Sequence, residues 1–142
     1  MVRINLINPK YLADQHLIAE YNEILMLLGY VRKNPKLTLS KIPLNYKLGK
    51  GHILFFKNKL RYLEKRFKLI KAEMRKRRFS EKINFDLTPF DRELIKDWKP
   101  NEKDKKIIKK RLIHKITLKP DYYKYYKNKK SKNFFIKMIE NA

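Results

Sequence analysis

The sequence predicts an all-α protein, a single compact domain of three long helices joined by irregular loops. Apolar residues recur at intervals of three and four in three stretches, which is the helical period. Proline stands at or just beyond the end of the first and third stretches, where it stops a helix. Alternating apolar and polar segments typical of strands are almost absent. At 142 residues, the chain is about one domain, spanning 1–142.

The first predicted helix covers about residues 12–34. Asp14 stands near its start and Pro35 prevents its continuation. Helical spacing gives it an apolar face, made of Leu17, Ile18, Tyr21, Ile24, Leu25 and Leu28. The opposite face carries His16, Ala19, Glu20 and Glu23, so His16 and Glu23, seven residues apart, share a row.

The second predicted helix covers about residues 58–78, with an earlier start near Gly51 as the alternative, and follows a loop at 34–50 that contains two prolines and a glycine. Its apolar residues are spaced 3, 4, 3, 4: Leu60, Leu63, Phe67, Ile70 and Met74. The other face is almost wholly basic. Residues 79–100 show a weak pattern and have no assigned role.

The third predicted helix covers about residues 101–118, where Ile108, Leu112 and Ile116 form one stripe and Pro120 ends the helix. A tail at 121–132 follows, rich in tyrosine and lysine. Aromatic planes combined with charge suit base stacking and phosphate binding, although some of these tyrosines are expected to pack in the core.

Charge points to a polyanionic partner. The chain has 37 basic and 14 acidic residues, a formal net charge of +23 that is spread along its length. DNA or RNA is the obvious partner for such a balance. The absence of cysteine excludes disulfides and thiolate chemistry, and three scattered histidines predict no metal site. No cofactor is expected. The apolar runs are too short for a membrane span, which favours an intracellular protein without a membrane partner.

A resemblance to a known family adds function to this interpretation. The residues that carry it are Arg3-Ile4-Asn5-Leu6, 12–17, Ala19-Glu20-Tyr21, Glu23, Val31-Arg32-Lys33, Leu48-Gly49, Gly51-His52, Phe55-Phe56, Lys59-Leu60 and Tyr123-Lys124-Tyr125-Tyr126. In these the chain resembles the pyrimidine-dimer DNA glycosylases of the phage endonuclease V type. The resemblance implies that the N-terminal segment packs between the helices. It also implies a metal-independent DNA glycosylase and AP lyase for cyclobutane pyrimidine dimers.

Two catalytic groups follow from the resemblance. The α-amine of Val2, exposed after removal of Met1, corresponds to the family's nucleophile, which forms an imine with the damaged nucleotide. At neutral pH roughly a tenth of chain termini are uncharged, against well under a thousandth of lysines, so a terminus suits this chemistry. Glu23 corresponds to the essential carboxylate that moves protons in β-elimination. Glu20, one turn earlier, competes for this role but is expected to cap the helix or pair with a base.

The remaining site residues are expected to contact DNA. They are Arg3, Gln15, His16, Arg32, Lys33, Arg111, Lys115, Tyr122 and Lys124. Without the resemblance, His16 is as well explained as a capping or core-edge histidine, and single lysines as a solvated face. Asn22 and Met26 depart from the family, which carries arginine at both positions. Because of this departure, other base lesions stay an alternative to the dimer as the substrate.

Two rival functions stay open on sequence alone. One is a non-enzymatic basic nucleic-acid-binding protein, which composition by itself favours. The other keeps the fold and the lyase step but acts on abasic sites or other base lesions. The expected partner in the leading hypothesis is double-stranded DNA with pyrimidine dimers, bound by a monomer in the cytoplasm, at the nucleoid, or in an infected cell.

Overall fold

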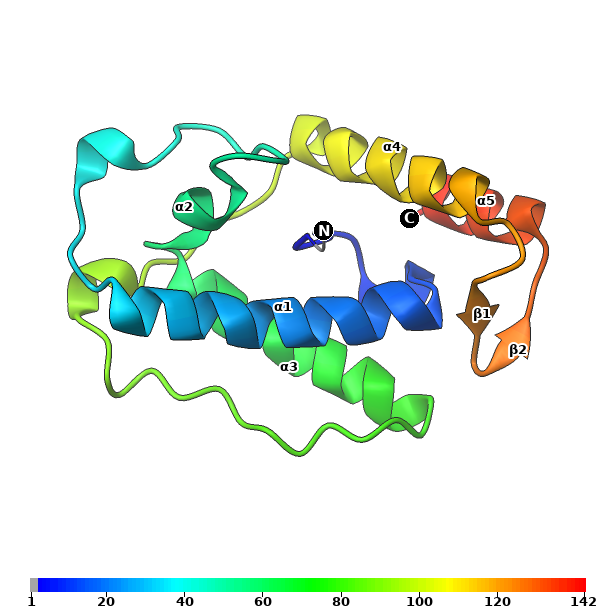
Figure 1. The fold of residues 1–142 in the computed structure, drawn as a ribbon, viewed down its shortest axis with the longest axis horizontal. Coiled ribbons are helices and arrows are strands. Elements are labelled where there is room, and N and C mark those ends of the chain that lie inside the picture. The colour runs from blue at the N-terminus through cyan, green and yellow to red at the C-terminus, as the bar shows by residue number, and fades with distance from the viewer. Residues whose placement is uncertain (1–2) are drawn as a thin grey trace.

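The computed structural model describes residues 3–142 and is mostly helical, in keeping with an all-α class. Its helices are α1 (Asp14–Lys33), α2 (His52–Phe56), α3 (Leu60–Lys76), α4 (Glu102–Leu118) and α5 (Lys132–Glu140). An antiparallel hairpin with strands of two residues each, β1 (Lys124–Tyr125) and β2 (Asn128–Lys129), connects α4 to α5. Short 3-10 turns lie at Pro9–Tyr11, Leu39–Lys41 and Arg92–Leu94. Figure 1 shows α1 lying on α3, with α4 on the opposite side of α1.

The three predicted helices correspond to α1, α3 and α4, with ends that differ by no more than two residues. The apolar stripe of α4 is buried, and a capping box fixes its start. There the Asn101 side chain accepts from the Asp104 N–H at 2.8 Å, while the Asp104 carboxylate accepts from the Asn101 N–H at 3.0 Å. Every helix within residues 3–142 is too short or too polar to cross a membrane.

The prediction of three helices is incomplete, because the structure adds α2 and α5. Ser131 caps α5 by accepting the Phe134 N–H at 3.1 Å, and α5 packs on α4 through the buried Phe135 and Ile139. The predicted tail at 121–132 is therefore a turn, a hairpin and the start of a helix. Aromatic packing also gives residues 79–100 a place, because Trp98 lies 5.1 Å from Phe55 between ring centroids.

The N-terminal segment, residues 3–7, is buried between α1 and α4 and belongs to no helix or strand (Figure 1). Its backbone polar groups are satisfied by side chains from distant parts of the chain. The Ile4 N–H donates to His52 Nε2 at 3.1 Å, and the Tyr46 hydroxyl donates to the Ile4 carbonyl at 2.9 Å. Tyr46 and His52 are themselves only 3% and 1% exposed, so buried side chains bind both peptide groups of Ile4.

A buried ion pair joins α1 to α3 beneath this segment. The guanidinium of Arg66 binds both carboxylate oxygens of Glu20, Nε to Oε2 at 2.6 Å and Nη2 to Oε1 at 2.9 Å. Arg66 also donates to the carbonyl of Ile7. Glu20 is fully buried, and of its two expected roles, capping the helix or pairing with a base, it takes the second.

A second buried arginine, Arg77, joins the hairpin to the helices. It pairs with Asp14 at 3.0 Å and with Glu73 at 2.9 Å, and the rings of Tyr125 and Tyr126 lie 4.5 and 5.0 Å from its guanidinium carbon. The Asp14 carboxylate also accepts the backbone N–H of Tyr126 at 3.1 Å. The hairpin is thus held against the start of α1.

Breaking the Glu20–Arg66 pair should strongly destabilise the fold. We expect Glu20→Ala to lower the free energy of unfolding by about 3–5 kcal/mol, because it leaves a buried guanidinium without its counter-charge. Replacing both partners, as Glu20→Leu with Arg66→Met, should recover most of this loss but not all, since the Ile7 carbonyl loses its donor. Urea unfolding of Glu20→Ala, of Glu20→Leu, of Arg66→Met and of the double variant measures this. A loss for the double variant equal to the sum of the losses for Glu20→Leu and Arg66→Met would contradict it.

Candidate active site

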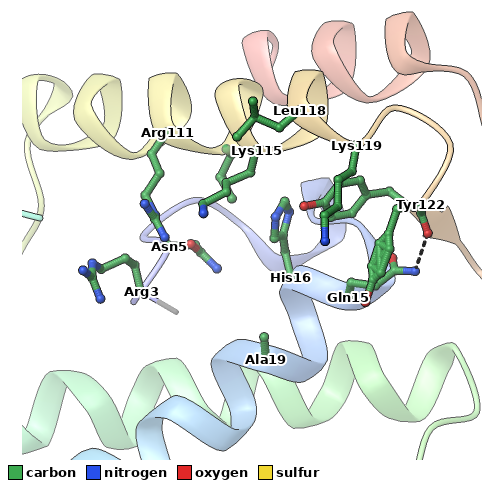
Figure 2. A pocket seen from close by; sticks show the side chains of 12 residues that line it. Arg3, Asn5, Gln15, His16, Ala19, Arg111, Lys115, Leu118, Lys119 and Tyr122 are labelled. Atoms are coloured by element: carbon green, nitrogen blue, oxygen red, sulfur yellow. Dashed lines mark hydrogen bonds between the residues drawn. The ribbon is translucent and has the colours of Figure 1, made fainter. Parts of the chain in front are cut away.

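A cavity of about 310 Å³ lies between the N-terminal segment, α1 and α4 (Figure 2). Side chains of α4 point toward the N-terminal segment, and the turn after α4 lines one side of the cavity. The lining residues are Arg3, Asn5, Gln15, His16, Ala19, Arg111, Leu112, Lys115, Leu118, Lys119, Tyr122 and Tyr123. Six residues predicted to contact DNA are therefore brought together from four parts of the chain.

The cavity wall is strongly cationic. Arg3 comes from the N-terminal segment, and Arg111, Lys115 and Lys119 come from α4 and its end; none of the described lining residues is acidic. Burial, followed by the nearby charge of Arg3, lowers the pKa of Arg111. This crowding of like charge favours an anion such as a phosphate in the cavity.

Glu23 lies one helical turn beyond Ala19 on the same side of α1 and is only 6% exposed. Burial raises the pKa of its carboxyl group, the nearby Arg3 opposes the rise, and Glu20 adds to it. A carboxyl group whose pKa moves toward neutral can both take and release a proton, which acid–base catalysis requires. Ala19 lines the cavity, whereas Glu23 is not among its lining residues.

His16 lies at the base of the cavity, where its ring packs 4.7 Å from the ring of Tyr123. Burial, with the charges of Arg111 and Lys115, lowers the pKa of His16 to about 4, so the ring is neutral at pH 7. Its Nδ1 is buried and has no hydrogen-bond partner among residues 3–142. His16 is thus a core-edge histidine that also lines the cavity, and its contact with DNA stays a prediction.

Gln15 has a structural task that the sequence did not indicate. Its Nε2 donates to the Tyr122 carbonyl at 2.9 Å, and its Oε1 accepts from the Lys124 N–H at 3.0 Å (Figure 2 shows the first bond). These bonds place Tyr122 on the cavity wall. Tyr122 is 50% exposed, whereas Tyr123 is buried at 7%, as expected for part of the tyrosine cluster.

Other predicted residues lie outside this cavity. Arg32 and Lys33 are exposed at the far end of α1, and the side chain of Lys124 is exposed on β1. Asn22 and Met26 lie on the exposed surface of α1 between the cavity and that far end. Val2, the predicted nucleophile, lies outside the described residues.

A comparison with protein families identifies the chain. The family model described as pyrimidine dimer DNA glycosylase matches residues 1–87, more than half of the 142 residues. This chain belongs to the pyrimidine dimer DNA glycosylase family. The family implies DNA as the substrate and a DNA glycosylase activity broadly directed at pyrimidine dimers.

The match separates two groups of residues in this pyrimidine dimer glycosylase. Arg3, His16 and Glu23 lie within the matched residues, as do Tyr46, His52 and Arg66, which bind the backbone of the N-terminal segment. Arg111, Lys115 and Tyr122 lie beyond residue 87, and the fold alone brings them to the cavity. Their roles in DNA binding stay predictions.

Sequence reasoning missed Tyr46 and His52, which set the position of the segment that carries Arg3. Gly51-His52 was among the residues that carry the resemblance, but no local pattern indicated a role for either residue. Their partner, Ile4, lies 42 and 48 residues away in sequence.

Stability of this glycosylase should fall in mildly acidic solution. Burial lowers the pKa of both His16 and His52 from 6.5 to about 4. Between these two pH values the unfolded chain therefore binds more protons than the folded chain does. Each histidine therefore contributes stability above pH 6.5 that is lost as the pH falls toward 4, about 3 kcal/mol apiece. Urea unfolding measured between pH 7 and pH 4 checks this.

Two variants locate the effect. His52→Gln keeps an acceptor for the Ile4 N–H but does not titrate, so its stability should depend less on pH than that of the wild type. His114→Gln, at an exposed position on α4, is the matched control. If the free energy of unfolding depends equally on pH in the wild type and in His52→Gln, His52 does not contribute to the pH dependence.

Proposed function

We propose that this glycosylase also cleaves the DNA backbone, as an AP lyase that uses its N-terminal amine. One observation carries the proposal: Arg3, the residue after Val2, lines a cationic cavity, and its charge acts on Glu23, whose pKa is raised by burial. Arg3 thus links the carboxyl group of Glu23 to the cationic cavity, and Val2 is the neighbour of Arg3 in sequence. An amine and a carboxyl group are the groups that imine formation and β-elimination require.

The chemistry proceeds in two stages. In the first, the uncharged α-amine of Val2 attacks C1′ of the damaged nucleotide, the bond from C1′ to the base breaks with its electron pair going to the base, and the base takes up a proton. Loss of the amine proton and opening of the sugar then give an imine. Glu23 is the proposed carrier of these protons.

In the second stage, a base removes a proton from C2′ and the bond from C3′ to its oxygen breaks, which releases the strand on the 3′ side of the lesion with a phosphate at its 5′ end. The positive charge of the imine draws electrons from C2′, so the carboxylate of Glu23 is a sufficient base. These steps require no metal ion or cofactor.

DNA is held chiefly through its phosphates in this proposal. Arg3, Arg111 and Lys115 would bind phosphates around the lesion, and Tyr122 offers an exposed ring for stacking. Damage weakens base pairing, which lowers the cost of base extrusion and gives selectivity without reading base edges. A monomer is sufficient, because one chain supplies every group.

A second candidate keeps the lyase but changes the lesion. Met26 is 67% exposed and Asn22 is exposed, so the surface of α1 next to Glu23 presents no cation where the family is expected to carry arginines. Weaker grip on a bulky dimer would favour abasic sites or smaller base lesions, which need less distortion of the duplex.

Trapping the covalent intermediate tests the mechanism. Incubation with a dimer-containing duplex and borohydride should give a reduced adduct that mass spectrometry maps to the mature N-terminus. Glu23→Gln should abolish strand cleavage while leaving duplex binding within a few-fold, because it removes a proton carrier and not a cation. Glu93→Gln, exposed and remote in sequence, is the control. Tight binding with no adduct and no cleavage would leave only a DNA-binding role.

Restoring the two cations tests the lesion preference. The variant Asn22→Arg with Met26→Arg should strengthen binding to dimer-containing duplex and steepen its salt dependence by about one to two phosphate contacts. We expect the ratio of cleavage rates, dimer over abasic site, to rise. An unchanged ratio would show that these positions do not set the choice of lesion.

A further inference from the structure

A second basic hollow lies at the C-terminal end of α1. It encloses about 430 Å³, and its walls come from α1, the loop that follows it and α2. Figure 1 places that loop and α2 at the same end of the molecule as the C-terminus of α1. Four lysines line the hollow, Lys33, Lys36, Lys41 and Lys57, and none of its described lining residues is acidic. We call it the lysine pocket.

Lys57 distinguishes this pocket from an ordinary surface cluster. The residue is only 7% exposed, and its ammonium donates to the Lys36 carbonyl at 2.6 Å. An ammonium has three N–H donors, and residues 3–142 supply this one with a single hydrogen bond. The pocket therefore contains a buried cation, Lys57, with N–H donors still available to bind a ligand.

The charge balance of the pocket favours an anion. The C-terminal end of α1 carries roughly half a negative charge from its peptide dipoles, against four lysine side chains. Asn34 already binds the end of that helix, since its N–H and its side-chain amide both donate to the Tyr30 carbonyl at 3.0 Å. The helix end thus offsets only a small part of the positive charge.

One edge of α1 connects the lysine pocket to the cavity at the N-terminal segment. Ala19, Asn22, Met26, Tyr30 and Lys33 follow one another at spacings of three and four, so they form a single stripe. Ala19 lines the cavity, and Tyr30 and Lys33 line the lysine pocket. The stripe is about 21 Å long at 1.5 Å per residue, which equals about six base pairs of duplex.

We propose that the lysine pocket binds a backbone phosphate of the same DNA duplex whose lesion occupies the cavity, about six base pairs away. The inference rests on the proposed function for the direction of the DNA. Between the two sites α1 presents the uncharged Asn22 and Met26, so a duplex along the stripe is held at its two ends. A B-form backbone offers phosphates at this separation, and the ligand class is a phosphodiester.

Duplex length is the decisive variable. Wild-type binding to an abasic-analogue duplex with about twelve base pairs on each side of the lesion should be tighter than binding to one with about four. The variant Lys36→Gln with Lys41→Gln should lose most of this advantage, and its salt slope on the long duplex should fall by about one to two. Lys57→Met, if the variant folds, tests the contribution of the buried cation to duplex binding. The matched control is Lys68→Gln with Lys76→Gln, which removes the same charge from exposed positions on α3.

A localised change in the DNA gives a second readout. Neutral methylphosphonates placed five to seven positions from the lesion should weaken wild-type binding but not that of the Lys36→Gln with Lys41→Gln variant. Equal loss of long-duplex binding in this variant and the α3 control would overturn the inference. So would phosphate-ion binding that depends on these lysines while duplex binding does not.

Strand cleavage separates this inference from the proposed function. Absence of the borohydride adduct with the length advantage intact would defeat the lyase and leave the phosphate site standing. A normal adduct with no dependence on duplex length would defeat the phosphate site alone.

Discussion

The N-terminal segment imposes the constraint on which the rest of the structure depends. It runs buried between helices with no sheet or helix of its own, and buried backbone groups must be hydrogen-bonded. Side chains from α2, α3 and the loop before α2 supply these bonds: His52 and Tyr46 to Ile4, and Arg66 to Ile7. The fold therefore positions Ile4 and Ile7 through hydrogen bonds from distant side chains and not through a helix or sheet of their own.

This solution brings charge into the core and decides the use of the acidic residues on α1. A buried arginine is stable only with a carboxylate beside it, and Glu20 and Asp14 serve Arg66 and Arg77 in this way. Both carboxylates thereby lie in structural ion pairs. Glu23, farther along α1 and near Arg3, has a raised pKa instead, so helix position separates structural carboxylates from the candidate catalytic one.

Local patterns were sufficient for α1, α3 and α4 because each has a long apolar stripe with clear ends. The short α2 and α5 were missed, since five and nine residues offer too few turns to show a period. The resemblance indicated Arg3, His16 and Glu23, but spacing alone put Glu20 on the face of the helix opposite the apolar one and did not identify its partner. Its partner lies 46 residues away, and the partners of Gln15 lie more than 100 away, so no local pattern contains them.

The distribution of cations separates the residues of the proposed chemistry from those proposed to set the choice of lesion. Around the cavity, Arg3 and Arg111 come from elements held in place by the buried segment and by the capped α4, so their positions follow from the core. Along the exposed edge of α1, Asn22 and Met26 contribute no core contact that would fix the side chain at either position. Substitution there changes the grip on DNA at little cost in folding stability. Selection for a different lesion could therefore act on that edge while the terminus, Glu23 and their supports stay unchanged.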